Sequence, residues 1–386
     1  MTDDSYGKIT EAGLEELRER IGVTIDEPEP YVHEATLDTI RHWAHGIGDE
    51  TPLYTDESYA ADGPYGELVA PPTFLFATSK IMSGYVGGLP GVHAMFSGTD
   101  WEFHRPIRRG DRIRTESRLT DLVEHDTDFS GRAIQQIYTV DFYTDDGDHL
   151  ATADSWCFRT ERDTASQEKR KYESEGVEPA SWDEDDIERF ADHYRQQEPR
   201  GDEPRFIEDV AVGDELDTLL KGPMSVTGII AFDQGWGGLY IHAHGQLFDM
   251  IDAHPALGTT NSFGVPEPPE RVHWDHEFAQ EVGVPAAYDY GPERVSWLGH
   301  VCTHWMGDYG VLRDLYAEVR QHNLIGDVTW CSGEVTEKRV EDGDHLVDVD
   351  LEGRDQRDNV TVKGSATIQL PTRDDGPRSA IESIEE

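Results

Sequence analysis

The sequence contains an internal repeat, which constrains the fold more than any other feature. The segment Pro52 to Ala61 (PLYTDESYAA) aligns with Arg271 to Gln280 (RVHWDHEFAQ), and Tyr54 matches His273 at an offset of 273 − 54 = 219. Two more pairs of segments match in the same order: IRHWAHGIGD with IIAFDQGWGG, and FHRPIRRGDRI with VRQHNLIGDVT. Ordered matches of this kind indicate two copies of one structural unit.

The repeat also sets the expected domain boundaries. Its offset rises from 189 for the IRHWAHGIGD segment to 219 for PLYTDESYAA, which places an insert of about 30 residues, about 239-270, in the second half. Between the halves lies a charged stretch with few apolar residues, which is typical of a linker. We therefore expect an N-terminal domain over 1-161, a linker over 162-204 and a C-terminal domain over 205-386, each long enough for its own core.

Each half has the pattern of an α+β unit. A short helix, a glycine turn and a longer apolar helix come first, and strands with alternating apolar residues follow. One long helix followed by antiparallel strands predicts a sheet wrapped around that helix. The expected helices are Leu37 to His45 and Thr73 to Tyr85 in the first half, and Val226 to Asp233 and Pro292 to Met306 in the second.

The chain is strongly acidic: 33 Lys plus Arg face 79 Asp plus Glu, a formal charge of -46. Acid spread along the whole chain argues against nucleic acid or an anionic membrane as a partner. Molar salt screens charges beyond roughly 3 Å, so we predict a halophilic protein from a cell that keeps salt inside. The start of the chain lacks basic residues followed by an apolar run, and no apolar stretch approaches the length of a membrane helix. We therefore expect a soluble, cytoplasmic protein.

Together the matched segments resemble the MaoC-like dehydratases, also called the R-specific enoyl-CoA hydratase family, in its double hot-dog form. With the acidic composition, the resemblance is to a member of halophilic archaeal type. The family signature runs Gly-Asp-x-Asn-Pro-x-His-x-Asp, followed by a Pro break and an Ala-His-Gly helix start. The corresponding segments are GDETPLYTDESYAADGPYGELVAPPTF from Gly48 and VHWDHEFAQEVGVPAAYDYGPE from Val272. The resemblance implies two tandem hot-dog domains, each an antiparallel sheet wrapped around a long helix.

Neither half carries the complete Asp and His pair of that signature. Asp49 is present in the first half, but Tyr54 occupies the His position. His273 is present in the second half, but Gly238 occupies the Asp position ahead of the insert. We therefore expect a catalytic second half and a degenerate first half, in which Asp49 either completes a shared site or holds its own loop.

The resemblance implies a lyase, a hydro-lyase of the enoyl-CoA hydratase type that adds water reversibly to a 2-enoyl-CoA. The degenerate first half would then be opened to accept a bulky or branched acyl chain. Two alternatives stay open. One is a mesaconyl-CoA type hydratase acting on a short dicarboxylic thioester, and the other is a non-catalytic acyl-CoA-binding subunit of a hetero-oligomeric hydratase. No separate cofactor is expected, because coenzyme A is part of the acyl-CoA substrate. Further assembly would give a homodimer or a complex with a partner subunit.

Five residues of the second half are candidates for catalysis. His273 suits proton transfer near pH 7. Gly291 aligns with the family glycine, and the unpaired N–H groups at a helix start suit the oxyanion of a thioester. Asp233 and Asp275 are candidate carboxylate partners of His273, with Glu270 a third, and the sequence does not choose among them.

Cations are scarce in this chain, so those near the expected acyl-CoA channel are candidates for the coenzyme phosphates. The resemblance places Arg105, Arg108 and Arg320 there, together with Asn323. A guanidinium binds phosphate well, although each arginine would pair equally well with a surface carboxylate.

The insert contains His242 and His244 and, further on, His254. A His-x-His pair can bind zinc, but we expect no metal and instead an insert that caps or narrows the acyl tunnel. The three cysteines show neither metal-binding nor disulfide spacing.

Overall fold

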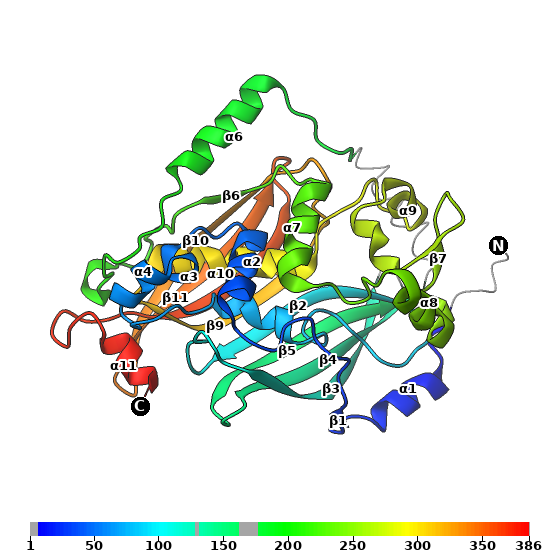
Figure 1. Ribbon diagram of the computed structural model, residues 1–386, viewed down its shortest axis with the longest axis horizontal. Coiled ribbons are helices and arrows are strands. Elements are labelled where there is room, and N and C mark those ends of the chain that lie inside the picture. The colour runs from blue at the N-terminus through cyan, green and yellow to red at the C-terminus, as the bar shows by residue number, and fades with distance from the viewer. Residues whose placement is uncertain (1–6, 128–130, 162–176, 386) are drawn as a thin grey trace.

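The computed structural model describes residues 7–127, 131–161 and 177–385, and one antiparallel sheet of ten strands runs through it (Figure 1). The strand order is β1-β3-β4-β5-β2-β9-β12-β11-β10-β6, so each half repeats one order outward from the centre. The strands are β1 (Thr24–Ile25), β2 (His93–Phe103), β3 (Ile113–Thr127), β4 (Gly131–Thr144), β5 (His149–Thr160), β6 (Leu219–Lys221), β9 (Val311–Val319), β10 (Thr329–Glu341), β11 (Asp344–Asp355) and β12 (Val360–Gln369).

The two halves of the sheet join at its centre, where β2 pairs with β9. In this register Asp100 lies opposite Tyr316, and 316 − 100 = 216. The segments FHRPIRRGDRI and VRQHNLIGDVT are related by the same offset of 216. Equivalent residues therefore meet at the centre, as they do about a twofold axis, and the repeat in the sequence is also a repeat in space. The predicted α+β class is confirmed.

A second contact between equivalent segments joins helices α2 (Leu37–Ile47) and α7 (Val226–Trp236), which lie side by side in Figure 1. Gly46 of α2 and Gly235 of α7, 189 residues apart in the chain, lie where the helices meet. A Cβ atom on Gly46 would lie 3.0 Å from the Cα atom of Phe232, and one on Gly235 would lie 2.7 Å from a carbonyl oxygen of α2. The absence of a side chain permits this approach, and both helices form where the sequence predicted them.

The central helix differs between the halves. In the second half α10 (Gly291–Met306) forms as predicted, packs on β9 to β12, and buries every side chain after its first residue. In the first half the predicted helix Thr73 to Tyr85 is wrong, because a shorter 3-10 helix, η1 (Pro72–Thr78), takes its place. The hydroxyls of Thr78 and Ser83 donate to backbone carbonyls of this stretch, each at 2.9 Å. Hydroxyls that bond the local backbone compete with continuous helix formation.

The linker and the insert carry elements of their own. Residues 162–176 of the predicted linker lie outside the described residues, and the rest of it contains α6 (Glu184–Gln196), whose Phe190 packs against Trp182 and Trp330. The elements within and next to the insert are α8 (His244–Ala253), η4 (Pro255–Leu257), β7 (Thr259–Thr260), β8 (Pro266–Glu267), η5 (Pro269–His273) and α9 (His276–Glu281). The remaining ones are α1 (Glu11–Arg18), α3 (Pro52–Thr55), α4 (Glu57–Asp62), η3 (Ile207–Asp209) and α11 (Ser379–Glu385).

Length and apolarity together decide whether a helix can cross a bilayer, and no helix in the described ranges has enough of both.

Candidate active site

His273 lies at the end of η5, next to the start of α10. Its Nδ1 atom is 2.8 Å from the carbonyl oxygen of Tyr288, and because a carbonyl only accepts, Nδ1 carries the proton and donates. The opposite nitrogen, Nε2, is therefore left as an acceptor. Burial lowers the pKa of His273 to about 4. The imidazole is thus neutral near pH 7 and able to accept a proton at Nε2.

Tyr290 connects His273 to helix α7. The ring of Tyr290 lies 3.8 Å from that of His273, centroid to centroid, and 4.6 Å from that of Trp236 on α7. Tyr290 is the N-cap residue of α10 and is only 3% exposed. No spacing pattern in the sequence marks this residue, because its position depends on how α7 packs against the start of α10.

Asp233 is the predicted carboxylate that faces this cluster. Burial, followed by the nearby charge of Glu270, raises the pKa of Asp233 to about 8, so the group is protonated at neutral pH. Burial and then the charge of Asp233 raise the pKa of Tyr290 well above its ordinary value, which places the two side chains next to each other. The Oδ1 atom of Asp233 is buried and has no hydrogen-bond partner among the described residues.

Asp275, the second predicted carboxylate, serves as a helix cap. Its carboxylate accepts from the backbone N–H of Phe278 at 3.0 Å, at the start of α9, and lies 3.5 Å from the guanidinium of Arg271. An N-cap aspartate stabilises the helix it begins. The structure therefore gives Asp275 a local role, whereas Asp233 is the carboxyl group beside Tyr290.

Glu270, the third candidate, ties together the two ends of the insert. Its carboxylate accepts from the backbone N–H groups of Leu239 and Tyr240, at 2.6 and 2.7 Å. Lys80 of the first half donates to the carbonyl of Leu239 at 3.3 Å. Burial raises the pKa of Glu270 to about 7. The neck of the insert is thus fixed beside Asp233 and Tyr290.

Gly291 opens α10, where the first N–H groups of a helix have no partner within the helix. A Cβ atom at this position would lie 2.1 Å from Cδ1 of Phe96, a residue of β2 in the first half. The ring of Phe96 therefore lies against the Cα atom of Gly291, and a side chain at this position would require the ring to move. The candidate site is built by both halves, although its ionisable groups come from the second.

Asp49 belongs to a different cluster. Its carboxylate lies 3.4 Å from Nε2 of His300, and Lys221 donates to Nδ1 of His300 at 2.7 Å and to the carbonyl of Ile47 at 2.7 Å. His300 follows Gly291 by nine residues, or about 14 Å along α10. Asp49 also accepts from the backbone N–H of Thr51 at 3.0 Å, so it holds its own loop as well as contacting His300, and this favours a structural role over a shared site. Lys221 and His300 were not expected from the sequence.

Two predicted phosphate contacts, Arg105 and Arg108, are paired with carboxylates. Arg105 donates to Asp111 at 2.9 Å, in the turn before β3. Arg108 donates to Glu67 at 2.7 Å. Both guanidiniums are mostly covered, so a phosphate would have to displace a carboxylate to bind them.

The other two predicted contacts differ from each other. Arg320 is half exposed and pairs with Glu318. Asn323 is fully buried and donates to the carboxylate of Asp289 at 3.1 Å. The prediction that Asn323 binds the coenzyme is therefore corrected: its amide holds a buried carboxylate and has no exposed surface.

The histidines of the insert do not gather in one place. His244 begins α8 and His254 caps its other end, ten residues later. Across the described ranges, no three His, Cys, Asp or Glu side chains converge as metal ligands do.

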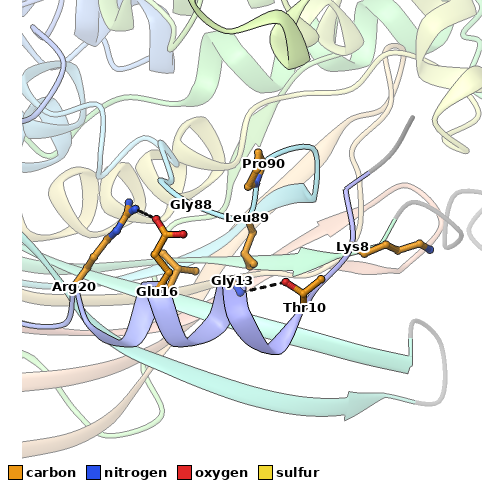
Figure 2. A pocket seen from close by; sticks show the side chains of 9 residues that line it. Lys8, Thr10, Gly13, Glu16, Arg20, Gly88, Leu89 and Pro90 are labelled. Carbon is orange, nitrogen blue, oxygen red and sulfur yellow. Dashed lines mark hydrogen bonds and ion pairs between the residues drawn. The ribbon is translucent and has the colours of Figure 1, made fainter. Parts of the chain in front are cut away.

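A cavity of about 430 Å³ lies away from these groups, between α1 and the loop of residues 88–90 (Figure 2). Its two cations are already paired, Lys8 with Glu161 at 3.0 Å and Arg20 with Glu16. No candidate site residue lines it.

Known proteins are similar to both the sequence and the fold. Residues 20–153 match the FAS1-like dehydratase domain region. A UPF0336 protein of Thermobifida fusca is 32% identical over 110 residues, which are 27% of this chain and 71% of the relative. A probable enoyl-CoA hydratase alpha subunit of Thermomonospora curvata is 24% identical over 173 residues, 39% of this chain and 53% of the relative. The chain belongs to the family of UPF0336 proteins, and within it residues 20–153 match a dehydratase domain region.

Two solved structures extend the likeness to nearly the whole chain. A MaoC-like dehydratase has a TM-score of 0.62 at 19% identity and covers 92% of this chain and 99% of its own. A Mycobacterium tuberculosis protein described as a double hotdog fold has a TM-score of 0.52 at 10% identity, covering 91% and 96%. The predicted double hot-dog fold is confirmed. The sequence relatives named here are actinobacterial, so they lend no support to a halophilic archaeal type, which stays a prediction from charge alone.

Proposed function

We propose that the protein is an acyl-CoA hydratase that adds water reversibly to the double bond of a 2-enoyl-CoA. One observation carries the proposal: a neutral histidine and a partly buried carboxylic acid of α7 lie beside the same residue, Tyr290, at the start of α10. The match of residues 20–153 to a dehydratase domain region supports dehydratase chemistry, and the name of the Thermomonospora curvata relative supports an enoyl-CoA substrate.

The proposed reaction uses three groups. The water oxygen bonds to C3 of the substrate while Nε2 of His273 accepts one water proton. Asp233, protonated at neutral pH, gives its proton to C2. The N–H of Gly291 donates to the thioester oxygen, on which negative charge develops as the π bond between C2 and C3 breaks. Transfer of a proton from His273 back to Asp233 then restores both groups.

The acyl chain is proposed to extend toward the first half. There the short η1 replaces the long central helix, and Phe96 lies directly against the start of α10. The insert begins beside Asp233 and is proposed to cover the acyl chain. Arg108 and Arg320 remain the proposed partners of the coenzyme phosphates, by exchange of their present carboxylate partners.

A dicarboxylic substrate would require a cation for its second carboxylate. Arg159 on β5 is a buried candidate, but it donates to the carbonyls of Leu89 and Val92, at 2.9 and 3.1 Å, and to the side-chain oxygen of Gln136 at 2.8 Å. Its hydrogen bonds are thus directed to neutral oxygens of the fold. Arg159 is therefore not placed to bind a second carboxylate.

A second candidate function is an acyl-CoA-binding subunit that needs a partner for catalysis. It is favoured by the name of the Thermomonospora curvata relative, an alpha subunit, and by Gly238, which stands where the family signature has its Asp.

The test is a hydratase assay in molar KCl that follows the loss of enoyl-thioester absorbance. Crotonyl-CoA, a medium-chain 2-enoyl-CoA and mesaconyl-CoA are the substrates, for the wild type and for His273→Ala. We expect turnover of an uncharged enoyl-CoA and a loss of about 100-fold or more in the variant. Wild-type protein that binds acyl-CoA but hydrates none of the three would contradict the proposal and favour the partner-subunit function.

A further inference from the structure

Tyr290 occupies the centre of the candidate site, although the proposed reaction does not assign it a step. Its ring lies against His273 on one side and Trp236 on the other. Its hydroxyl is buried beside the carboxyl group of Asp233, and neither this hydroxyl nor Oδ1 of Asp233 has any other hydrogen-bond partner among the described residues. A buried donor and a buried acceptor that are neighbours and otherwise unbonded satisfy each other at little cost.

We propose that Tyr290 is a positioning residue: its hydroxyl donates a hydrogen bond to Asp233 while its ring fixes the imidazole of His273. The packing supports this arrangement, because Trp236 lies three residues after Asp233 on the same helix, and residues three apart share a helix face. Hydrogen bonds in active sites often shorten only when substrate binds. The inference rests on the proposed hydratase function and adds a residue to it.

The hydroxyl would control how readily Asp233 releases its proton. The other ionisable groups that face Asp233 are Glu270 from η5 and Glu293 from the first turn of α10, and both are acids. Acids nearby and burial make ionisation of Asp233 harder, whereas a donated hydrogen bond makes it easier. Tyr290 is therefore the group that keeps Asp233 acidic enough to protonate C2.

The experiment compares Tyr290→Phe with wild type across pH 6 to about 10. Phenylalanine keeps the ring against His273 and removes only the hydroxyl. We expect kcat to fall about 10-fold with KM unchanged, as for the loss of one hydrogen bond to a reacting acid. Activity that needs protonated Asp233 is lost as pH rises through its pKa, so a higher pKa in the variant moves the alkaline limb of the profile upward.

Tyr54→Phe is the matched control, since Tyr54 is also a buried tyrosine and occupies the position of His273 in the first half. It should keep the wild-type pH profile. A second test places Tyr290→Phe in the Asp233→Asn background, where the hydroxyl has no acid to act on and should have no further effect on kcat.

Each result decides the inference. A wild-type pH profile for Tyr290→Phe, or an equal loss of kcat with and without Asp233, would overturn it and leave the hydratase function standing. A wild type that hydrates no enoyl-CoA would remove both. If Tyr290→Phe does not fold, the Asp233→Asn comparison is made with Tyr290→Trp, which also lacks the hydroxyl.

Discussion

The two halves of the molecule share one fold but keep different parts of one site. The offset of 219 that relates Tyr54 to His273 also relates Pro72, the first residue of η1, to Gly291, the first residue of α10. Proline has no backbone N–H to donate. The first half therefore lacks both the histidine and the helix-start donor, whereas the second half has both.

In the first half the remaining acid of the signature, Asp49, makes a structural contact instead. Asp49 pairs with His300, and Lys221 holds His300 and the end of α2 together. All three groups are nearly fully buried. A duplicated fold can thus keep a residue of one half in a contact that braces the other half.

The largest effect on activity is expected when His273 of the second half is replaced by tyrosine, the residue at the equivalent position of the first half. His273→Tyr should lower kcat/KM by at least about 100-fold, because the general base is lost. Tyr54→His, the reciprocal change, should give no second activity, since Pro72 still lacks an N–H group. Steady-state kinetics of both variants test this. Retained activity in His273→Tyr would mean that the two halves do not differ in the way proposed.

A change at the helix start separates the lost N–H from steric conflict. Gly291→Pro places at the start of α10 the residue type that begins η1, where Pro72 stands. It removes the N–H group proposed as the oxyanion donor, which should lower kcat by about 100-fold to 1,000-fold. Gly291→Ala keeps the N–H but places a Cβ atom against Phe96.

The combination with Phe96→Ala then decides between the two causes. Phe96→Ala should restore activity to Gly291→Ala but not to Gly291→Pro. Gly245→Ala, at a glycine of the insert with open space around it, gives the baseline. Equal recovery of both double variants would show that crowding, and not the N–H group, limits the reaction.

Much of the fold could be predicted from sequence because its determinants are local. Turn glycines, alternating strands and the matched segments recur at fixed offsets, so two equivalent α+β units and the start of α10 at Gly291 followed directly. The helix expected over residues 73–85 does not form, again for a local reason: the hydroxyls of Thr78 and Ser83 donate hydrogen bonds to backbone carbonyls. Apolar periodicity alone does not reveal that competition.

The site was less predictable, because contacts between distant segments assemble it. His273 and Gly291 could be named from the matched segments, but Tyr290 gains its role only where α7 meets α10. Lys221 and His300 lie 79 residues apart and meet only in the folded chain. Asn323 has the right chemistry for a ligand, but its burial was not visible in the sequence.

Loss of the contacts among Asp49, Lys221 and His300, called here the brace, should lower the free energy of unfolding and leave kcat unchanged. Lys221→Met removes a buried cation and leaves Asp49 and His300 without it, which should cost about 3 kcal/mol of unfolding free energy. Lys363→Met, at an exposed lysine of the same half, should change stability by less than about 0.5 kcal/mol. Urea denaturation in molar KCl measures both, and kcat of the folded fraction should stay at the wild-type value. A large loss of kcat in Lys221→Met would place the brace within the catalytic machinery.

The smallest expected effect has the opposite sign. The pKa of Asp233 is about 8 in the fold, above its value of about 4 in an unfolded chain. Between these values the unfolded chain has released the proton that the folded chain holds, so this group makes stability fall as pH rises. Asp233→Asn should therefore be more stable than wild type by an amount that grows from pH 5 and levels off above pH 8, on the order of 2 kcal/mol after allowance for partial exposure. Asp38→Asn, at an exposed position on α2, should follow the wild-type curve. If Asp233→Asn gains stability and loses activity, the acid that the proposed reaction needs destabilises the second half. The first half has Ala44 at the equivalent position and therefore lacks this destabilisation.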